Sequence, residues 1–143
     1  MIQPSDIFNI PSNKQFEKMA LKVFRFQYDH NKVYREFCDL LKIEKQRVKS
    51  VTQIPFLPIQ FFKTHDVVSN ENPVRVTFTS SGTTGMATSR HLVTDISLYE
   101  QSYRQAFSQF YGNIEDYVVL ALLPSYLERE GSSLIYVVND LIA

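Results

Sequence analysis

Hydroxyl-bearing residues and glycines gather in one short stretch of this chain, residues 79–89, called here the hydroxyl-rich segment. Seven of its eleven residues carry a hydroxyl group and two are glycines, although the whole chain of 143 residues has only four glycines. Gly82 and Gly85 can adopt positive φ, which lets backbone N–H groups converge on an anion, and the neighbouring serines and threonines add further donors. The segment can therefore bind a polyphosphate through neutral donors, and a plain turn between two strands is the alternative.

The spacing within this segment excludes two common catalytic loops. Gly82 and Gly85 stand too close together for the pattern G-x-x-x-x-G-K-[ST], and no lysine follows them, so this is not the loop of P-loop NTPases. The pattern G-x-S-x-G of a nucleophile elbow is also missing, which makes Ser81 a poor candidate nucleophile.

Strands are expected on both sides of the hydroxyl-rich segment. Val74, Val76 and Phe78 alternate with polar residues in the period of a strand, and residues 90–94 read as a second short strand. Residues 117–123 form a continuous apolar run, which predicts a strand covered on both faces inside an α/β sheet.

Helices are predicted where apolar residues recur with helical spacing. Ser12 and Gln15 form the S-x-x-Q pattern of a capping box, and Asp95 or Ser97 can cap a later helix that Gly112 ends. The expected helices cover residues 16–28, 32–41 and 98–110, and a capped apolar stretch covers residues 134–143. Between the second helix and the first strand, the prolines in residues 52–64 predict an extended apolar connector that lies against the core. The fold class is therefore α/β, with N-terminal helices followed by a mixed sheet flanked by helices.

The bulk composition narrows the classes of function. Fifteen basic and fifteen acidic residues balance to zero without long runs of one sign, which argues against nucleic-acid binding. Residues 1–143 have the length of a single unit with one core, and they contain no apolar stretch long enough for a membrane span and no export signal. No Cys/His cluster has metal-binding spacing, and the single Cys38 reads as a small half-buried core residue, so we expect a soluble, cytoplasmic protein.

The run Ser80-Ser81-Gly82-Thr83-Thr84-Gly85 resembles the signature loop of the adenylate-forming superfamily, which includes acyl-CoA synthetases and nonribosomal adenylation domains. Residues 54–63 and 122–134 narrow the resemblance to the acyl-protein synthetase branch, the fatty-acid-activating component of bacterial bioluminescence and its relatives. The likeness spans most of the chain from about Ile54 onward.

The resemblance implies an ATP-dependent acyl ligase with two steps. A fatty or aryl carboxylic acid attacks the α-phosphate of ATP to give an acyl-adenylate and pyrophosphate, and the acyl group then passes to a thiol of CoA or of a partner protein. Ser80, Ser81, Gly82, Thr83, Thr84 and Gly85 would hold the β- and γ-phosphates with Mg²⁺. Tyr126 would lie near the acyl chain, with a surface aromatic as the alternative.

The chain departs from the superfamily pattern in two respects. The lysine that usually follows the loop is missing, and Arg90 or His91 can supply positive charge there, although solvent-facing strand positions are the alternative. The downstream motifs for Mg²⁺, ribose and the final lysine are also missing, so we expect residues 1–143 to be the truncated N-terminal part of one adenylate-forming domain, inactive by itself. Residues 1–50 would form a helical lead-in and residues 74–143 an α/β part with the phosphate loop. A non-catalytic module that binds nucleotide or protein through the same loop is the competing hypothesis.

Overall fold

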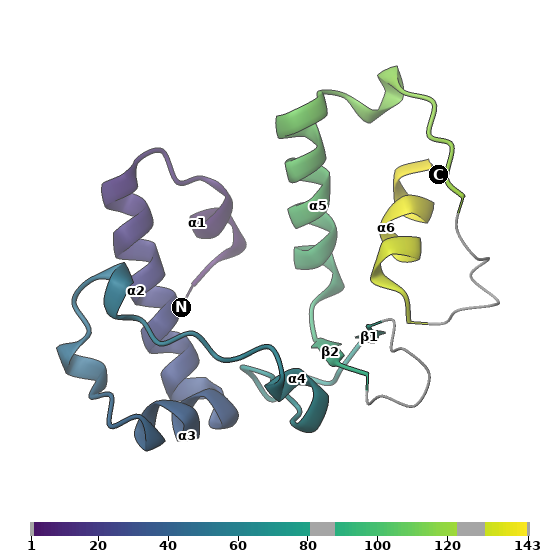
Figure 1. Ribbon diagram of the computed structural model, residues 1–143. Coiled ribbons are helices and arrows are strands. Elements are labelled where there is room, and N and C mark those ends of the chain that lie inside the picture. The colour runs from purple at the N-terminus through teal and green to yellow at the C-terminus, as the bar shows by residue number, and fades with distance from the viewer. Residues whose placement is uncertain (1, 81–87, 123–130, 143) are drawn as a thin grey trace. The chain divides into compact units, whose positions relative to one another are not determined.

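A computed structural model of the chain describes residues 2–80, 88–122 and 131–142, and these residues form two compact units (Figure 1). The first unit ends at Asn72 and the second begins at Pro73, within the polar turn that precedes the first strand. The sequence predicted one unit with one core, whereas the described residues divide into two compact units. Each half of the chain has amphipathic helices of its own, and these bury separate sets of apolar residues.

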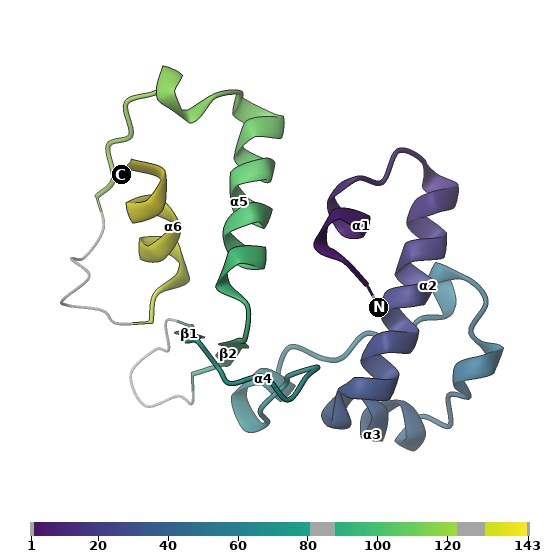
Figure 2. The same ribbon diagram turned by 180° about the vertical axis from the view of Figure 1, so that it is seen from behind.

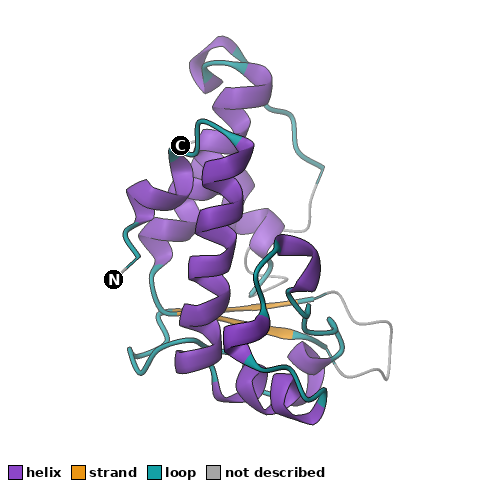
Figure 3. Ribbon diagram, turned by 90° about the vertical axis from the view of Figure 1, so that its left-hand side faces the viewer, coloured by secondary structure: helices purple, strands orange, loops and turns teal. Residues whose placement is uncertain are grey.

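The first unit is helical and the second combines helices with a small sheet (Figure 3). The first contains α1 (Pro4–Phe8), α2 (Asn13–His30), α3 (Lys32–Leu40) and α4 (Phe61–Thr64). The second contains β1 (Val76–Thr79), β2 (Arg90–Val93), α5 (Ile96–Tyr111) and α6 (Ser133–Ile142). Short 3-10 turns lie at Lys45–Arg47, Val51–Gln53 and Ile114–Asp116. The predicted α/β class is confirmed, and α2, α3 and α5 lie where the helical spacing predicted them.

The core of the first unit forms where α2, α3 and the following connector meet. Phe24, Tyr34, Cys38 and Val48 are buried together, and residues 54 and 57 of the connector pack against them. The connector was expected to lie against the core, and this is confirmed. It is not extended throughout, because α4 begins soon after the second of its two prolines, where the chain is again free to form a helical turn.

One buried residue, Asn31, joins α2 to α3. Its backbone N–H donates to the Gln27 carbonyl at the end of α2, and its side-chain oxygen accepts from the Tyr34 N–H at 3.0 Å to cap α3. Its amide nitrogen also donates to the Ser69 hydroxyl at 3.2 Å. Asn31 therefore satisfies groups of two helices and of a third segment while it is itself 4% exposed.

Asn31→Ala is expected to destabilise the first unit by about 2 kcal/mol, because it removes a helix cap and leaves the buried Tyr34 N–H without its acceptor. Amide hydrogen exchange of α3 measures this loss residue by residue. Ser12→Ala is the matched control, since Ser12 caps α2 at an exposed position through a 3.3 Å bond from the Gln15 N–H. Its expected cost is smaller, roughly 0.5–1 kcal/mol, and equal costs for the two variants would contradict the role assigned to Asn31.

In the second unit, α5 and α6 lie side by side, as the two opposite views show (Figures 1 and 2). Asp95 caps α5 through the N–H groups of Ser97 and Leu98, and Gly112 ends it with a φ of 86°, as the sequence predicted. The Arg104 guanidinium on α5 donates to the Asp140 carboxylate on α6 at 2.8 Å. This ion pair lowers the pKa of Asp140 and holds the two helices together on their solvent side.

The strand predicted for residues 117–123 is not a strand where the structure describes it, up to residue 122. These residues are exposed instead of covered, with Val118 88% and Leu120 92% exposed. A strand buried on both faces needs neighbouring strands and covering helices, and the described residues supply a ladder only between β1 and β2. An apolar run shows that a segment can be buried. Whether it forms a buried strand depends on neighbouring strands, which the run itself does not reveal.

Among the described residues, no helix combines the length and the apolar character that crossing a bilayer requires.

Candidate functional site

The hydroxyl-rich segment leaves the sheet through a hydrogen-bonded neck. β1 and β2 are antiparallel, with Thr79 opposite Arg90 at the end of the ladder. Beyond this pair, the Ser80 N–H donates to the Ser89 carbonyl at 3.1 Å, and the Ser89 N–H donates to the Ser80 hydroxyl oxygen at 3.0 Å. We call Ser80 and Ser89 the neck. The neck closes the base of the segment, so residues 81–88 are joined at both ends to a paired strand.

Ser80, the first of the predicted phosphate-binding residues, is hydrogen-bonded within the neck. The Ser80 hydroxyl oxygen accepts within the neck, which leaves its own proton able to donate to a ligand. Ser89 is 7% exposed and was not singled out from the sequence, because its burial depends on the paired strands. Ser81, Gly82, Thr83, Thr84 and Gly85 lie outside the described residues, as does Tyr126, so their predicted roles stay predictions.

Two candidate cationic residues follow the neck directly. Arg90 is exposed and lies opposite Thr79, next to the neck, whereas His91 is half-buried opposite Phe78. Solvent-facing positions were the alternative predicted for both residues, and the exposed Arg90 agrees with it better than the half-buried His91. Because it follows Ser89 directly, Arg90 is the cationic side chain that the described strands place beside the hydroxyl-rich segment.

On the edge of β1 that faces away from β2, Gly131 is hydrogen-bonded to Thr79, the residue before the neck. Successive N–H groups of a strand point to opposite edges, so the Thr79 N–H points away from β2, and it donates to the Gly131 carbonyl at 2.8 Å. Gly131 directly precedes Ser132, whose hydroxyl accepts from the Ile135 N–H at 3.4 Å in the first turn of α6. The start of α6 therefore lies beside the beginning of the hydroxyl-rich segment.

An aromatic cluster beneath the neck fixes β1 against both helices of the second unit. Phe78 is buried, and its ring centroid lies 5.1 Å from that of Tyr99 on α5 and 5.5 Å from that of Tyr136 on α6. The Tyr136 hydroxyl donates to the Glu100 carboxylate at 2.6 Å, which raises the pKa of Tyr136 to about 12. Tyr136 therefore packs on Phe78 of β1 through its ring and is hydrogen-bonded to α5 through its hydroxyl.

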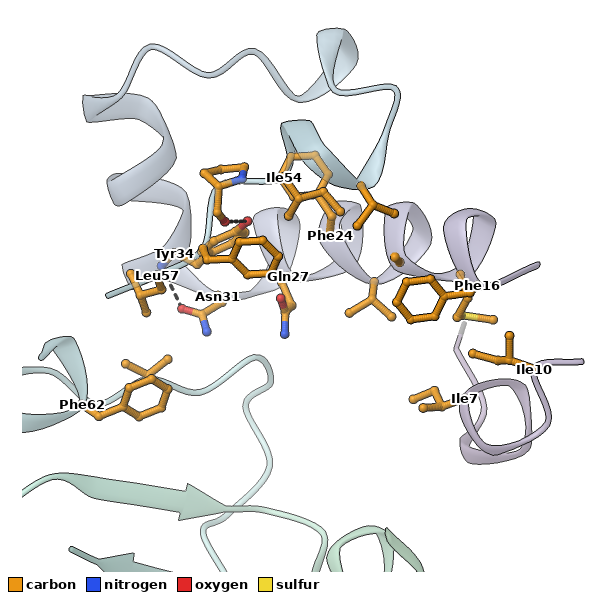
Figure 4. A pocket seen from close by; sticks show the side chains of 17 residues that line it. Ile7, Ile10, Phe16, Phe24, Gln27, Asn31, Tyr34, Ile54, Leu57 and Phe62 are labelled. Atoms are coloured by element: carbon orange, nitrogen blue, oxygen red, sulfur yellow. Dashed lines mark hydrogen bonds between the residues drawn. The ribbon is translucent and has the colours of Figure 1, made fainter. Parts of the chain in front are cut away.

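A cavity of about 370 Å³ in the first unit offers a different environment (Figure 4). It runs along one face of α2, past Phe16 and Val23, to residues 54–57 of the connector. None of the described residues that line it carries a charge. The Tyr34 hydroxyl on its wall is already bonded to the Pro55 carbonyl at 2.6 Å. The cavity therefore suits an apolar group, whereas a polyphosphate needs the donors of the hydroxyl-rich segment.

Cys38 has no access to a substrate in this structure. Its side chain is fully buried within the core of the first unit, and this burial raises the pKa of its thiol. A thiol that accepts an acyl group reacts as the thiolate, which burial in apolar surroundings disfavours. The expectation that Cys38 is a core residue is confirmed, and it is a poor acyl acceptor.

We expect native Cys38 to react with 5,5′-dithiobis(2-nitrobenzoate) far more slowly than the same chain in urea, because labelling requires the first unit to open. Cys38 is the single cysteine, so the absorbance change reports on it alone. Labelling of the folded chain at the rate of the unfolded chain would contradict the burial described here.

No group of three or more histidine, cysteine, aspartate or glutamate side chains with the arrangement of a metal site occurs among the described residues. His30 and His65, to which the sequence assigned no role, pack against the rings of Phe26 and Phe61 at centroid distances of 4.6 and 5.1 Å. These contacts are structural in character.

The family of the chain follows from comparison with known sequences. Residues 3–109, which include both strands, the neck and most of α5, match the acyl-protein synthetase family LuxE. The chain belongs to this family. A long-chain-fatty-acid–luciferin-component ligase of Photorhabdus luminescens is 38% identical to this LuxE-family chain over 71 residues. That alignment covers 49% of the chain and 60% of the relative, which is less than two thirds of the relative's length. No solved structure shows a significant match.

Membership of the LuxE family confirms the acyl-protein synthetase branch that the sequence resembled, and it places the chain in a family of enzymes. The match covers the hydroxyl-rich segment and ends before residues 123–130 and α6. Gly131 and its bond to Thr79 therefore lie beyond the part of the chain that the family match covers.

Proposed function

We propose that this LuxE-family chain is the N-terminal part of an ATP-dependent acyl ligase of the adenylate-forming type. The observation that carries the proposal is the hydrogen-bonded neck at Ser80, the first residue of the run 80–85, in a chain of an acyl-protein synthetase family. In this proposal residues 1–50 form a helical lead-in and residues 74–143 form the α/β part of one larger domain.

ATP with Mg²⁺ is the proposed cofactor of the hydroxyl-rich segment. Neutral N–H and hydroxyl donors suit phosphate oxygens, and the Ser80 proton and the exposed Arg90 side chain at the neck add to the donor set. Residues 80–85 contain no carboxylate, so they fit the phosphates directly and Mg²⁺ only through the phosphates. When bound, MgATP supplies the α-phosphate that a carboxylate attacks.

The proposed task of residues 80–85 is electrostatic. Their donors would stabilise the negative charge that grows on the departing pyrophosphate, which lowers the barrier to acyl-adenylate formation. A long-chain fatty acid is the proposed substrate, because the similar Photorhabdus protein is named a long-chain-fatty-acid ligase. The acyl group would then pass to a thiol of CoA or of a partner protein, and the buried Cys38 does not serve as that thiol.

The test is carboxylate-dependent exchange of labelled pyrophosphate into ATP by the full-length gene product, with straight-chain acids of increasing length and with aryl acids. We expect exchange that depends on the acid and is strongest with long chains. If none of the acids supports exchange, the ligase proposal is contradicted and a non-catalytic nucleotide- or protein-binding module is favoured.

A further inference from the structure

Gly131 is hydrogen-bonded to β1 at the start of the hydroxyl-rich segment. Its carbonyl accepts the Thr79 N–H at 2.8 Å, and its own backbone has a φ of +78°, which residues with side chains rarely adopt. A Cβ atom at this position would lie 3.1 Å from the Thr79 hydroxyl oxygen and 3.3 Å from the Thr77 carbonyl oxygen. Both the backbone conformation and the close approach of β1 therefore favour glycine.

The position of Gly131 is itself fixed from the side of α6. The next residue, Ser132, accepts from the N–H groups of Ile135 and Tyr136 through its hydroxyl and its carbonyl. Ile135 is buried, and the Tyr136 ring packs on Phe78, the residue before Thr79. The start of α6 is therefore linked to β1 in two places: Gly131 is hydrogen-bonded to Thr79, and Tyr136 packs on Phe78.

We propose that Gly131 is a positioning residue that sets where the hydroxyl-rich segment begins and so determines how well it grips the phosphates of ATP. This inference rests on the proposed function. Thr79 directly precedes Ser80, and Ser80 forms one side of the neck, so a shift of Thr79 moves the neck from which the proposed donors start. Displacements of about 1 Å cost up to roughly 100-fold in rate where geometry is used for catalysis.

Gly112 provides a matched control. It also has positive φ, at +86°, but a Cβ atom there would meet nothing within 4 Å. Gly131→Ala and Gly112→Ala both place a side chain at a backbone position with positive φ, whereas only the first crowds Thr79. In the full-length protein we expect Gly131→Ala to raise the KM for ATP and lower kcat for pyrophosphate exchange by about tenfold or more. We expect Gly112→Ala to leave both parameters near the wild-type values.

A readout that does not need activity accompanies the kinetics. Hydrogen exchange of the Thr79 amide reports its bond to Gly131, and we expect it to accelerate in Gly131→Ala and not in Gly112→Ala. If the alanine variant does not accumulate as folded protein, Gly131→Asn replaces Gly131→Ala, because asparagine is enriched among the residues that adopt positive φ and still carries a Cβ atom.

The outcomes separate this inference from the proposed function. An active wild-type enzyme in which the Gly131 and Gly112 variants behave alike, in kinetics and in Thr79 exchange, would overturn the inference alone. If no acid supports pyrophosphate exchange by the wild-type protein, the proposed function is overturned. The role of Gly131 in that function then falls too, whatever the hydrogen-exchange rate of the Thr79 amide.

Discussion

Replacing Thr84 with alanine in the full-length protein is expected to slow carboxylate-dependent ATP–pyrophosphate exchange by about 100-fold. The proposed donors act on charge that develops as pyrophosphate leaves, and removing one such donor from a preorganised site costs roughly 10²- to 10³-fold in kcat. The lower end of this range applies because several donors share the same phosphates. The effect should fall mainly on kcat, because the lost interaction strengthens in the transition state.

Thr88→Ala is the control for this experiment. Thr88 is exposed, carries the same side chain and lies in the same segment, but it stands outside the six-residue run of the proposed phosphate grip. We expect it to retain wild-type exchange kinetics. If Thr84→Ala is as active as Thr88→Ala, Thr84 does not stabilise the leaving group and the assignment of residues 80–85 loses its main support.

Phe24→Ala is expected to destabilise the first unit by about 3–5 kcal/mol, which is the usual range for deleting a fully buried phenyl ring. Phe24 is 1% exposed, and its ring packs against those of Tyr28 and Tyr34 at centroid distances of 6.3 and 6.2 Å. Small units have free energies of unfolding near the lower end of about 5–15 kcal/mol. The substitution should therefore remove most of the stability of this unit.

Phe16→Ala tests whether burial causes the loss. Phe16 lies on the same helix and is 53% exposed, so about 1 kcal/mol is expected for its removal. Urea denaturation followed by amide hydrogen exchange in α2 measures the two variants side by side. Comparable losses would show that the core of the first unit does not centre on Phe24.

Features that depend on neighbours in the sequence could be predicted. The cap at Ser12 and the apolar spacing that follows it predicted α2 to within a few residues, because a helix satisfies its own backbone and needs only one surface to pack on. The same holds for α5, which Asp95 begins and Gly112 ends. The strands beside the hydroxyl-rich segment were predicted because alternation of apolar residues is also a local signal.

Features that depend on distant segments could not be predicted. Gly131 was noted only as part of residues 122–134 and had no predicted role of its own, because its contact with Thr79 joins residues far apart in the chain. The burial of Ser89 likewise depends on its bonds to Ser80 across the neck. For the candidate site, a motif predicted which residues bind the phosphates, whereas the contacts of its first residue, Ser80, required the structure.

The exposed apolar stretch at residues 117–122 has a consequence for how pieces of this protein behave in solution. It consists of one tyrosine, two valines, two leucines and one alanine, and it contains neither proline nor a charged residue. Segments of this length and composition stack readily into cross-β aggregates when nothing covers them. Any shortened form that leaves these residues uncovered is therefore prone to fibril formation, and a charged residue in place of Val118 would act as a gatekeeper against it.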